Sequence, residues 1–204
     1  MKLSKTQEEI IIMIKRVFVL GMTALMLVAC GGDAGVSQAE FDGKIAELPE
    51  CPYVSGEATV KVTQKQASAS QSRNATFTFA KEGGVWDVAS STGDASDLSS
   101  FSTMYMHTVD LYEEAIDTYV DMLDNPSLNY YVKGEGFGLK LTGKIDYSKL
   151  VSGGVGGVLD QTLKIDWDKY GMLTKWDFEC SGNLEYAGQK VSYSETDLIT
   201  VSWR

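Results

Sequence analysis

The chain has 204 residues, of which 44% are hydrophobic, and 18 Lys and Arg stand against 28 Asp and Glu, a formal net charge of −10. Such an acidic surface repels phosphate groups, so nucleic acid is excluded as an expected partner. The length suits one domain that can bury a sizeable core.

The chain begins with a segment that is typical of an export signal. Lys15 and Arg16 precede an apolar run over residues 17–29. This run is too short to cross a bilayer, which needs about 20 residues. A basic start, a short apolar stretch and small residues before the cut are the marks of a signal peptide. We therefore predict a signal peptide over residues 1–29, with either Met1 or Met13 as its start.

The segment Leu27-Val28-Ala29-Cys30 resembles the lipobox of bacterial lipoproteins. The resemblance implies cleavage before Cys30, a lipid on its thiol, and anchoring to the cell membrane at the extracytoplasmic face. Residues 30–36 would then be the lipidated cysteine and a tether, and residues 37–204 a single domain. Loss of residues 1–29 removes four basic and two acidic side chains, which leaves 14 and 26 and a net charge of −12. This charge either keeps the domain off an anionic bilayer or only confers solubility, and solubility is the simpler interpretation.

The N-terminal half of the domain predicts one short helix and a set of strands. Ser37 and Glu40 form a capping-box pair, and apolar residues recur at i, i+4 and i+7 from Phe41. Residues 58–62 alternate between apolar and polar, as a strand does. Residues 77–88 alternate around a Lys-Glu-Gly-Gly turn, which indicates a hairpin.

One long amphipathic helix is predicted over residues 102–123. Asp124-Asn125-Pro126 should end it. Its apolar residues recur at helical spacing and are Val109, Tyr112, Ile116, Tyr119, Val120 and Leu123.

The C-terminal half reads as a series of strands joined by short turns. The alternating segments are residues 128–132, 137–141, 163–167, 176–180 and 191–203. Short connections force antiparallel neighbours. We therefore predict an α+β fold: a curved antiparallel sheet of about eight strands, one long helix packed on its concave face, and a short N-terminal helix.

Two acidic residues break the apolar parity of the last strand. Glu195 and Asp197 fall at positions that should face the core. This pattern predicts either a β-bulge or a rim at which that face meets water.

Two cysteines remain beside Cys30. Cys51 and Cys180 could form a disulfide in an oxidising compartment, or they could be two buried free thiols. Together with a single histidine they cannot supply a zinc shell of known spacing. We expect no metal and no cofactor.

The sequence offers no nucleophile–base pair. His107 is the only histidine, and no orienting carboxylate or nucleophile is placed with it. Asp166 and Asp168 flank Trp167, and we expect them to project to solvent opposite an inward Trp167. Residues 152–157 are rich in glycine but lack the ending of a P-loop, so they read as a flexible loop or as the lip of a cavity. The chain is therefore not expected to be an enzyme.

The strand and helix pattern over residues 58–203 resembles the half-barrel lipoproteins of the LolA, LppX and LprG type. The strand, Asp-x-x-Gly turn and strand of residues 162–173 are similar to their late hairpins. The resemblance implies an apolar cavity for lipids or acyl chains. The hairpin of residues 77–88 resembles instead that of cystatin-like NTF2 domains.

These patterns favour a membrane-anchored, non-enzymatic binder of an apolar or amphipathic ligand, such as a lipid. The alternative is a structural or protein-interaction module of the cell envelope with a filled core and a protein partner. For the binder, parity and helical spacing predict the lining residues Tyr112, Ile116, Tyr119, Phe137, Leu139, Trp167 and Trp176.

Overall fold

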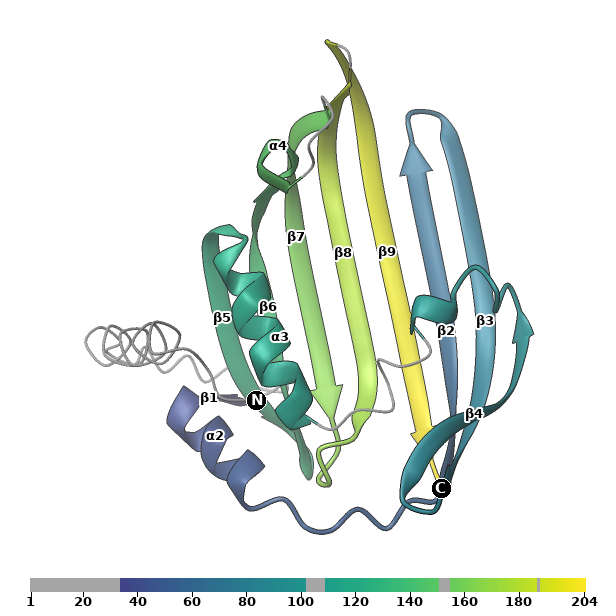
Figure 1. Cartoon of the computed structure of the whole chain (residues 1–204). Helices are drawn as coiled ribbons and strands as arrows, with labels where there is room; N and C mark the ends of the chain where they lie inside the picture. The colour runs from purple at the N-terminus through teal and green to yellow at the C-terminus, as the bar shows by residue number, and fades with distance from the viewer. Residues whose placement is uncertain (1–33, 102–108, 151–154, 187) are drawn as a thin grey trace, which may run out of the picture. The chain divides into compact units, whose positions relative to one another are not determined.

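The computed structural model describes residues 34–101, 109–150, 155–186 and 188–204. All of them belong to the unit Gly31–Arg204. Nine antiparallel strands form one sheet in the order β1-β5-β6-β7-β8-β9-β2-β3-β4 (Figure 1). The strands are β1 (Ala34–Val36), β2 (Ser55–Gln66), β3 (Ala69–Glu82), β4 (Val85–Gly93), β5 (Asp124–Lys133), β6 (Gly136–Asp146), β7 (Val155–Trp167), β8 (Leu173–Tyr186) and β9 (Gln189–Trp203).

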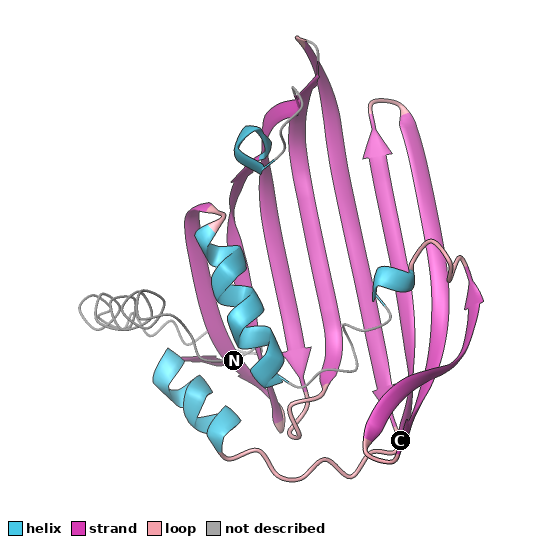
Figure 2. Ribbon diagram, viewed as in Figure 1, coloured by secondary structure: helices cyan, strands magenta, loops and turns pink. Residues whose placement is uncertain are grey.

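Short helices accompany this sheet (Figure 2). They are α2 (Gln38–Ala46), the 3-10 helix η1 (Ser99–Phe101), α3 (Val109–Asp121) and α4 (Tyr147–Leu150). The Ser37 side chain accepts a hydrogen bond from the Glu40 backbone N–H, and the Glu40 carboxylate accepts one from the Ser37 N–H, which confirms the capping box. Across the described residues, we find no helix with the length and apolar character needed to span a membrane.

The predicted α+β class is wrong. The protein is mostly β, with nine antiparallel strands and short helices in place of about eight strands and one long helix packed on them. α3 has 13 residues and ends at Asp121, while residues 102–108 of the predicted helix lie outside the described residues. The polar residues 64–72 mostly extend the strands, since β2 runs to Gln66 and β3 begins at Ala69, and the cross-strand ladder satisfies their backbone groups.

Two local predictions also need correction. Residues 34–36, the end of the predicted tether, form β1 and pair with Tyr130–Val132 of β5. β9 has no bulge at Glu195 or Asp197, because its register with β2 and β8 is continuous there. Both carboxylates therefore stay on the core-facing side of the sheet. Glu195 is half-buried, as at a rim, but Asp197 is buried.

The two faces of the sheet differ in character. We call the face that contacts α3 the inner face; one register row on it runs through Val60, Ile199, Trp176, Ile165 and Leu139. The neighbouring row lies on the outer face and is mainly polar: Lys61, Leu198, Asp177, Lys164 and Lys140. The hydrophobic core therefore lies on the inner face.

Helices and loops cover the inner face unequally. Figure 1 shows α3 in front of β6 and β7, and η1 in front of β2, on the same side of the sheet. Phe41 of α2 packs its ring against Tyr130 and Phe137, with ring centroids 4.5 and 5.4 Å apart. Leu98, just before η1, is buried in the core. The strands β8 and β9 run between these two covered regions.

Candidate functional site

The predicted lining residues meet in one region, and most of them are core. Tyr112, Ile116, Phe137, Leu139 and Trp167 are each at most 8% exposed, whereas Tyr119 and Trp176 are partly buried at the edge of the core. The Tyr112 ring contacts those of Trp167 and Trp176, with centroids 5.7 and 6.2 Å apart. A ligand could therefore reach the five buried side chains only if α3 moved. A pocket between helix and sheet stays a prediction.

A polar cluster lies on the inner face next to this core. Register places Gln161, Cys180, Glu195 and Gln64 in one row across β7, β8, β9 and β2. Gln64 Nε2 donates to Glu195 Oε1 at 2.9 Å, and the Tyr193 hydroxyl donates to Glu195 Oε2. Both oxygens of the Glu195 carboxylate are thus held by neighbouring side chains. We call these five residues, together with Asp197, the inner polar cluster.

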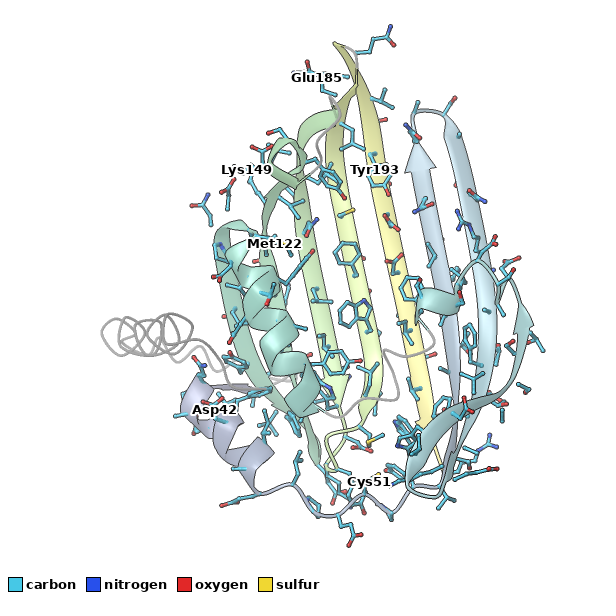
Figure 3. The ribbon with its side chains drawn as sticks, viewed as in Figure 1. Asp42, Cys51, Met122, Lys149, Glu185 and Tyr193 are labelled. Atoms are coloured by element: carbon cyan, nitrogen blue, oxygen red, sulfur yellow. The ribbon has the colours of Figure 1, made fainter. Side chains whose placement is uncertain are left out.

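The cluster continues to α3 through a tyrosine. The Tyr119 hydroxyl donates to Gln161 Oε1, which ties the last turns of α3 to the middle of β7. Burial raises the pKa of Tyr119 and of Tyr193, so both hydroxyls keep their protons and act as hydrogen-bond donors. Figure 3 shows Tyr193 on the upper part of β9 in this view.

Asp197 is the member of the cluster whose carboxylate is incompletely satisfied. Its residue is 8% exposed, and its Oδ1 has no hydrogen-bond partner in the described part of the chain. It lies opposite Phe178 of β8 and Val62 of β2. Burial, and then the negative charge of Glu195, raise the pKa of Asp197 to about 7. A buried acceptor without a partner costs folding free energy, so it marks a position at which a ligand could supply the missing bond.

Cys180 is buried beside these carboxylates. Burial, and then the charge of Glu195, raise the pKa of its thiol to about 11. Both Cys180 and Cys51 are free, so the predicted disulfide is absent. Of the alternative, two buried free thiols, only Cys180 fits fully, because Cys51 is half-buried.

The positions of the two thiols explain why no bridge forms. Cys51 lies two residues before Tyr53, whose ring stacks on Trp203 at the end of β9. Cys180 pairs with Glu195, eight residues back along that strand, which is roughly 26 Å at the rise of a β-strand. A disulfide needs Cα atoms within about 7 Å. Figure 3 places Cys51 at the opposite end of the strands from Tyr193.

The second buried aspartate, Asp166, lies on the outer face. It was expected to project to solvent, but it is only 3% exposed. Lys133 Nζ lies 2.7 Å from its Oδ2, and the Tyr131 hydroxyl donates to its Oδ1. Burial raises the pKa of Asp166, but the hydrogen bonds from Lys133 and Tyr131 outweigh burial and hold the pKa below its usual value. Asp168 instead closes the β7–β8 turn by accepting from the backbone N–H groups of Tyr170 and Met172.

A hollow of about 280 Å³ lies over β7, β8 and β9, and all of its lining residues except Cys180 and Glu195 belong to the outer face. It includes none of the predicted lining residues. Carboxylates and hydroxyls dominate its walls, so it offers little to an apolar chain. Its lining residues are Asp160, Thr162, Glu179, Cys180, Ser181, Ser194, Glu195 and Thr196.

The described residues include only part of the groups that bear on metal binding or catalysis. No group of three or more His, Cys, Asp or Glu side chains among them is placed to hold a metal ion. His107 and residues 151–154 of the glycine-rich segment lie outside the described part, whereas residues 155–157 begin β7. The inner polar cluster was not predicted as a site from the sequence. The only sequence signal for it was that Glu195 and Asp197 fall at core-facing positions of their strand.

No protein-family model matches the chain, and the search of curated proteins found no match.

Proposed function

We propose that the protein is a lipid-anchored, non-enzymatic binder of an amphipathic ligand on the extracytoplasmic face of the cell membrane. The observation that carries the proposal is the composition of the inner face, where the half-buried apolar rings of Trp176 and Phe178 border the inner polar cluster. A ligand with an apolar chain and a polar head needs both kinds of surface side by side.

Part of this apolar surface remains exposed to solvent on β8. Trp176 and Phe178 of β8 face inward and are half-buried, in contrast to the fully buried Ile165 and Ile199 beside Trp176. An alkyl chain lying across these two rings would remove their remaining apolar surface from water, which stabilises the complex by about 25 cal/mol per Å². The polar head would then reach Asp197, which lies opposite Phe178.

The membrane anchor rests on the sequence. Leu27-Val28-Ala29-Cys30 follows a short apolar run, and the mature chain keeps a strongly acidic balance. A single acyl chain binds membranes only weakly, so stable anchoring takes more than one chain on the cysteine. The repulsion between an acidic domain and anionic lipid supports a domain that stays off the bilayer surface.

The anchor is tested by replacing its cysteine. Cys30→Ala should leave the protein unlipidated, so its mass should lack the lipid and the precursor should stay uncleaved or lose its attachment. Cell fractionation and intact-mass measurement read out both effects. A Cys30→Ala protein with the same mature mass and membrane fraction as wild type would refute the anchor.

Ligand binding is tested separately. Native protein purified under mild conditions should carry a co-purified amphiphile that mass spectrometry detects. The full-length protein should also shift its tryptophan emission when short-chain amphiphiles are added, because Trp176 is half-buried on the inner face. Phe178→Ser should weaken that response, whereas the same exchange at outer-facing Thr196 should not.

A second candidate function is an interaction module with a filled core. It is favoured by the burial of five of the seven predicted lining residues. In that case neither co-purified ligand nor emission shift should be observed, and the protein should instead be recovered with an envelope partner after crosslinking in cells.

A further inference from the structure

We infer that Asp197, oriented beside Glu195, is a head-group site on the inner face and that it takes a protonated amine. The inference rests on the proposed function and specifies its ligand. Asp197 is 8% exposed, and its Oδ1 lacks a hydrogen-bond partner in the described residues. Folded proteins satisfy nearly all buried acceptors, so an acceptor that lacks a partner next to the half-buried rings of Phe178 and Trp176 indicates a donor that comes from a ligand.

The charges around the site select a cation. Glu195 and Asp197 are two residues apart on β9 and face the same side, so their Cβ atoms lie roughly 7 Å apart. Both Glu195 oxygens already accept from Gln64 and Tyr193, which holds this carboxylate in place. Two carboxylates at this separation attract an ammonium group and repel a carboxylate or phosphate.

Among the described residues, three further titratable or charged groups face Asp197 from the strands around it. Cys180 of β8 carries a thiol that is neutral at pH 7, because burial raises its pKa to about 11. Tyr193 of β9 is a neutral donor to Glu195. Arg73 of β3 lies in the same register row, two strands away, and its Nη2 donates to Gln64 Oε1 at 3.4 Å and to Gln71 Oε1 at 3.3 Å. The guanidinium thus donates to amide oxygens of Gln64 and Gln71. The open acceptor of Asp197 can therefore take a donor from a ligand.

The apolar surroundings suit the rest of such a ligand. Phe178 lies directly opposite Asp197, and Trp176 lies two residues farther along β8 on the same face. The half-buried rings can pack against an alkyl chain, and an ammonium next to an aromatic face gains a further cation–π attraction. An alkylamine is the simplest molecule that uses both surfaces.

Binding of an ammonium displaces a proton from Asp197. At pH 6 this carboxyl is mostly protonated, because its pKa is raised to about 7. The ammonium replaces the proton as the partner of the carboxylate, and the proton passes to solvent. Affinity for the amine should therefore rise with pH, by about tenfold between pH 6 and pH 8.

The test uses full-length protein in phosphatidylcholine nanodiscs, with empty nanodiscs as the blank. Octylamine, octanoate and octanol are titrated by calorimetry. We expect octylamine to bind at least tenfold more tightly than octanoate at pH 7.5. Asp197→Asn should lower octylamine affinity by tenfold or more and remove its pH dependence. Glu179→Gln, which removes one negative charge from the outer face of β8, should change neither.

A second measurement needs no variant. Octylamine should slow the alkylation of Cys180, which lies opposite Glu195, and leave Cys51 unaffected. Octanoate or octanol binding as tightly as octylamine, with protection of Cys180, would overturn the amine site and keep the proposed function. Failure of all three probes to bind would overturn both. Unchanged octylamine affinity in a folded Asp197→Asn protein would overturn the amine site alone.

Discussion

Asp166 and Asp197 form a natural comparison between the two faces of the sheet. Both are aspartates within strands, and they are 3% and 8% exposed. Burial acts on both in the same direction. Yet the pKa of Asp166 lies below its usual value, because Lys133 and Tyr131 outweigh burial, whereas the pKa of Asp197 is raised to about 7 by burial and by Glu195.

The difference shows that the neighbouring groups, rather than burial alone, decide whether the pKa of a buried carboxyl is raised or lowered. On the outer face Asp166 is part of a closed network in which a cation and a hydroxyl satisfy the charge. On the inner face Asp197 meets a like charge and an open acceptor position. The outer aspartate therefore stabilises the sheet. The Oδ1 of the inner aspartate lacks a partner in the described chain, and a cationic ligand would supply one and offset the negative charge.

The largest effect is expected from a substitution that disturbs the hydrogen-bond network of Asp166 on the outer face. Gly138 lies under the Tyr131 ring, and a Cβ there would stand 2.4 Å from the Ile165 carbonyl oxygen and 2.6 Å from the Tyr131 hydroxyl. Gly138→Ala should cost about 2–3 kcal/mol in urea unfolding, because backbone or ring must shift. Gly43→Ala in α2 is the matched control: a Cβ there meets nothing within 4 Å, and the exchange should stabilise by about 0.5–1 kcal/mol. Equal effects of the two exchanges would contradict the close approach.

The next prediction removes one donor from Asp166. Tyr131→Phe should destabilise the protein by about 2 kcal/mol at pH 7, since a bond to a charged acceptor is lost in a buried place. The folded pKa of Asp166 is lowered, so its ionised contribution is present above the unfolded pKa of about 3.9 and is lost as the pH falls through the folded value. The loss of unfolding free energy in Tyr131→Phe, measured with denaturant, should be smaller at pH 3 than at pH 7. A loss that is the same at both pH values would show that the hydroxyl does not act through the charge.

On the inner face, we expect ionisation of Asp197 to lower the stability of the fold, opposite to the effect of Asp166. Because the folded pKa of Asp197 is raised to about 7, the folded state holds this proton more tightly than the unfolded chain, whose aspartates titrate near about 3.9. Stability should therefore fall as the pH rises from about 4 to about 7. Asp197→Asn should stabilise the protein by about 1–2 kcal/mol at pH 8 and by much less at pH 4. Destabilisation at pH 8 would mean that the carboxylate has a partner.

The smallest expected effect is a difference in the alkylation rates of the two cysteines, which measures solvent access to the inner face. Cys180 is 4% exposed and its thiol pKa is raised to about 11, whereas Cys51 is half-buried. Iodoacetamide at pH 8 should modify Cys51 at least tenfold faster than Cys180, because the thiolate is the reactive form. Peptide mass spectrometry after timed quenching measures both rates. Faster modification of Cys180 would show that β8 opens more readily than its burial implies.

Local elements could be predicted from the sequence because neighbours in the chain determine them. The capping box at Ser37 needs only Glu40 three residues later. The hairpin between β3 and β4 turns at Gly83 and Gly84, both with positive φ, as the Gly-Gly pair indicated. The Asp168 turn likewise depends on backbone groups two and four residues away.

The fold class could not be predicted because it depends on pairing between distant segments. β9 pairs with β2, which lies more than a hundred residues earlier, and this pairing joins the two meanders into one nine-stranded sheet. Alternation marks a strand but does not name its partner. Helical spacing from Val109 to Leu123 correctly indicated a helix, which ends at Asp121, but it overestimated the helix's share of the fold.

The sequence by itself determined which side chains share a face, since the two-residue period of a strand places Glu195 and Asp197 with Ile199 and Val201. It also determined the acidic charge of the domain. Only the tertiary structure decided that Asp166 meets Lys133, 33 residues away, while Asp197 lies beside Glu195 and its Oδ1 meets no donor in the described chain. The physical reason is that a carboxylate's ionisation depends on its surroundings in space, and those come from strands that the fold brings together.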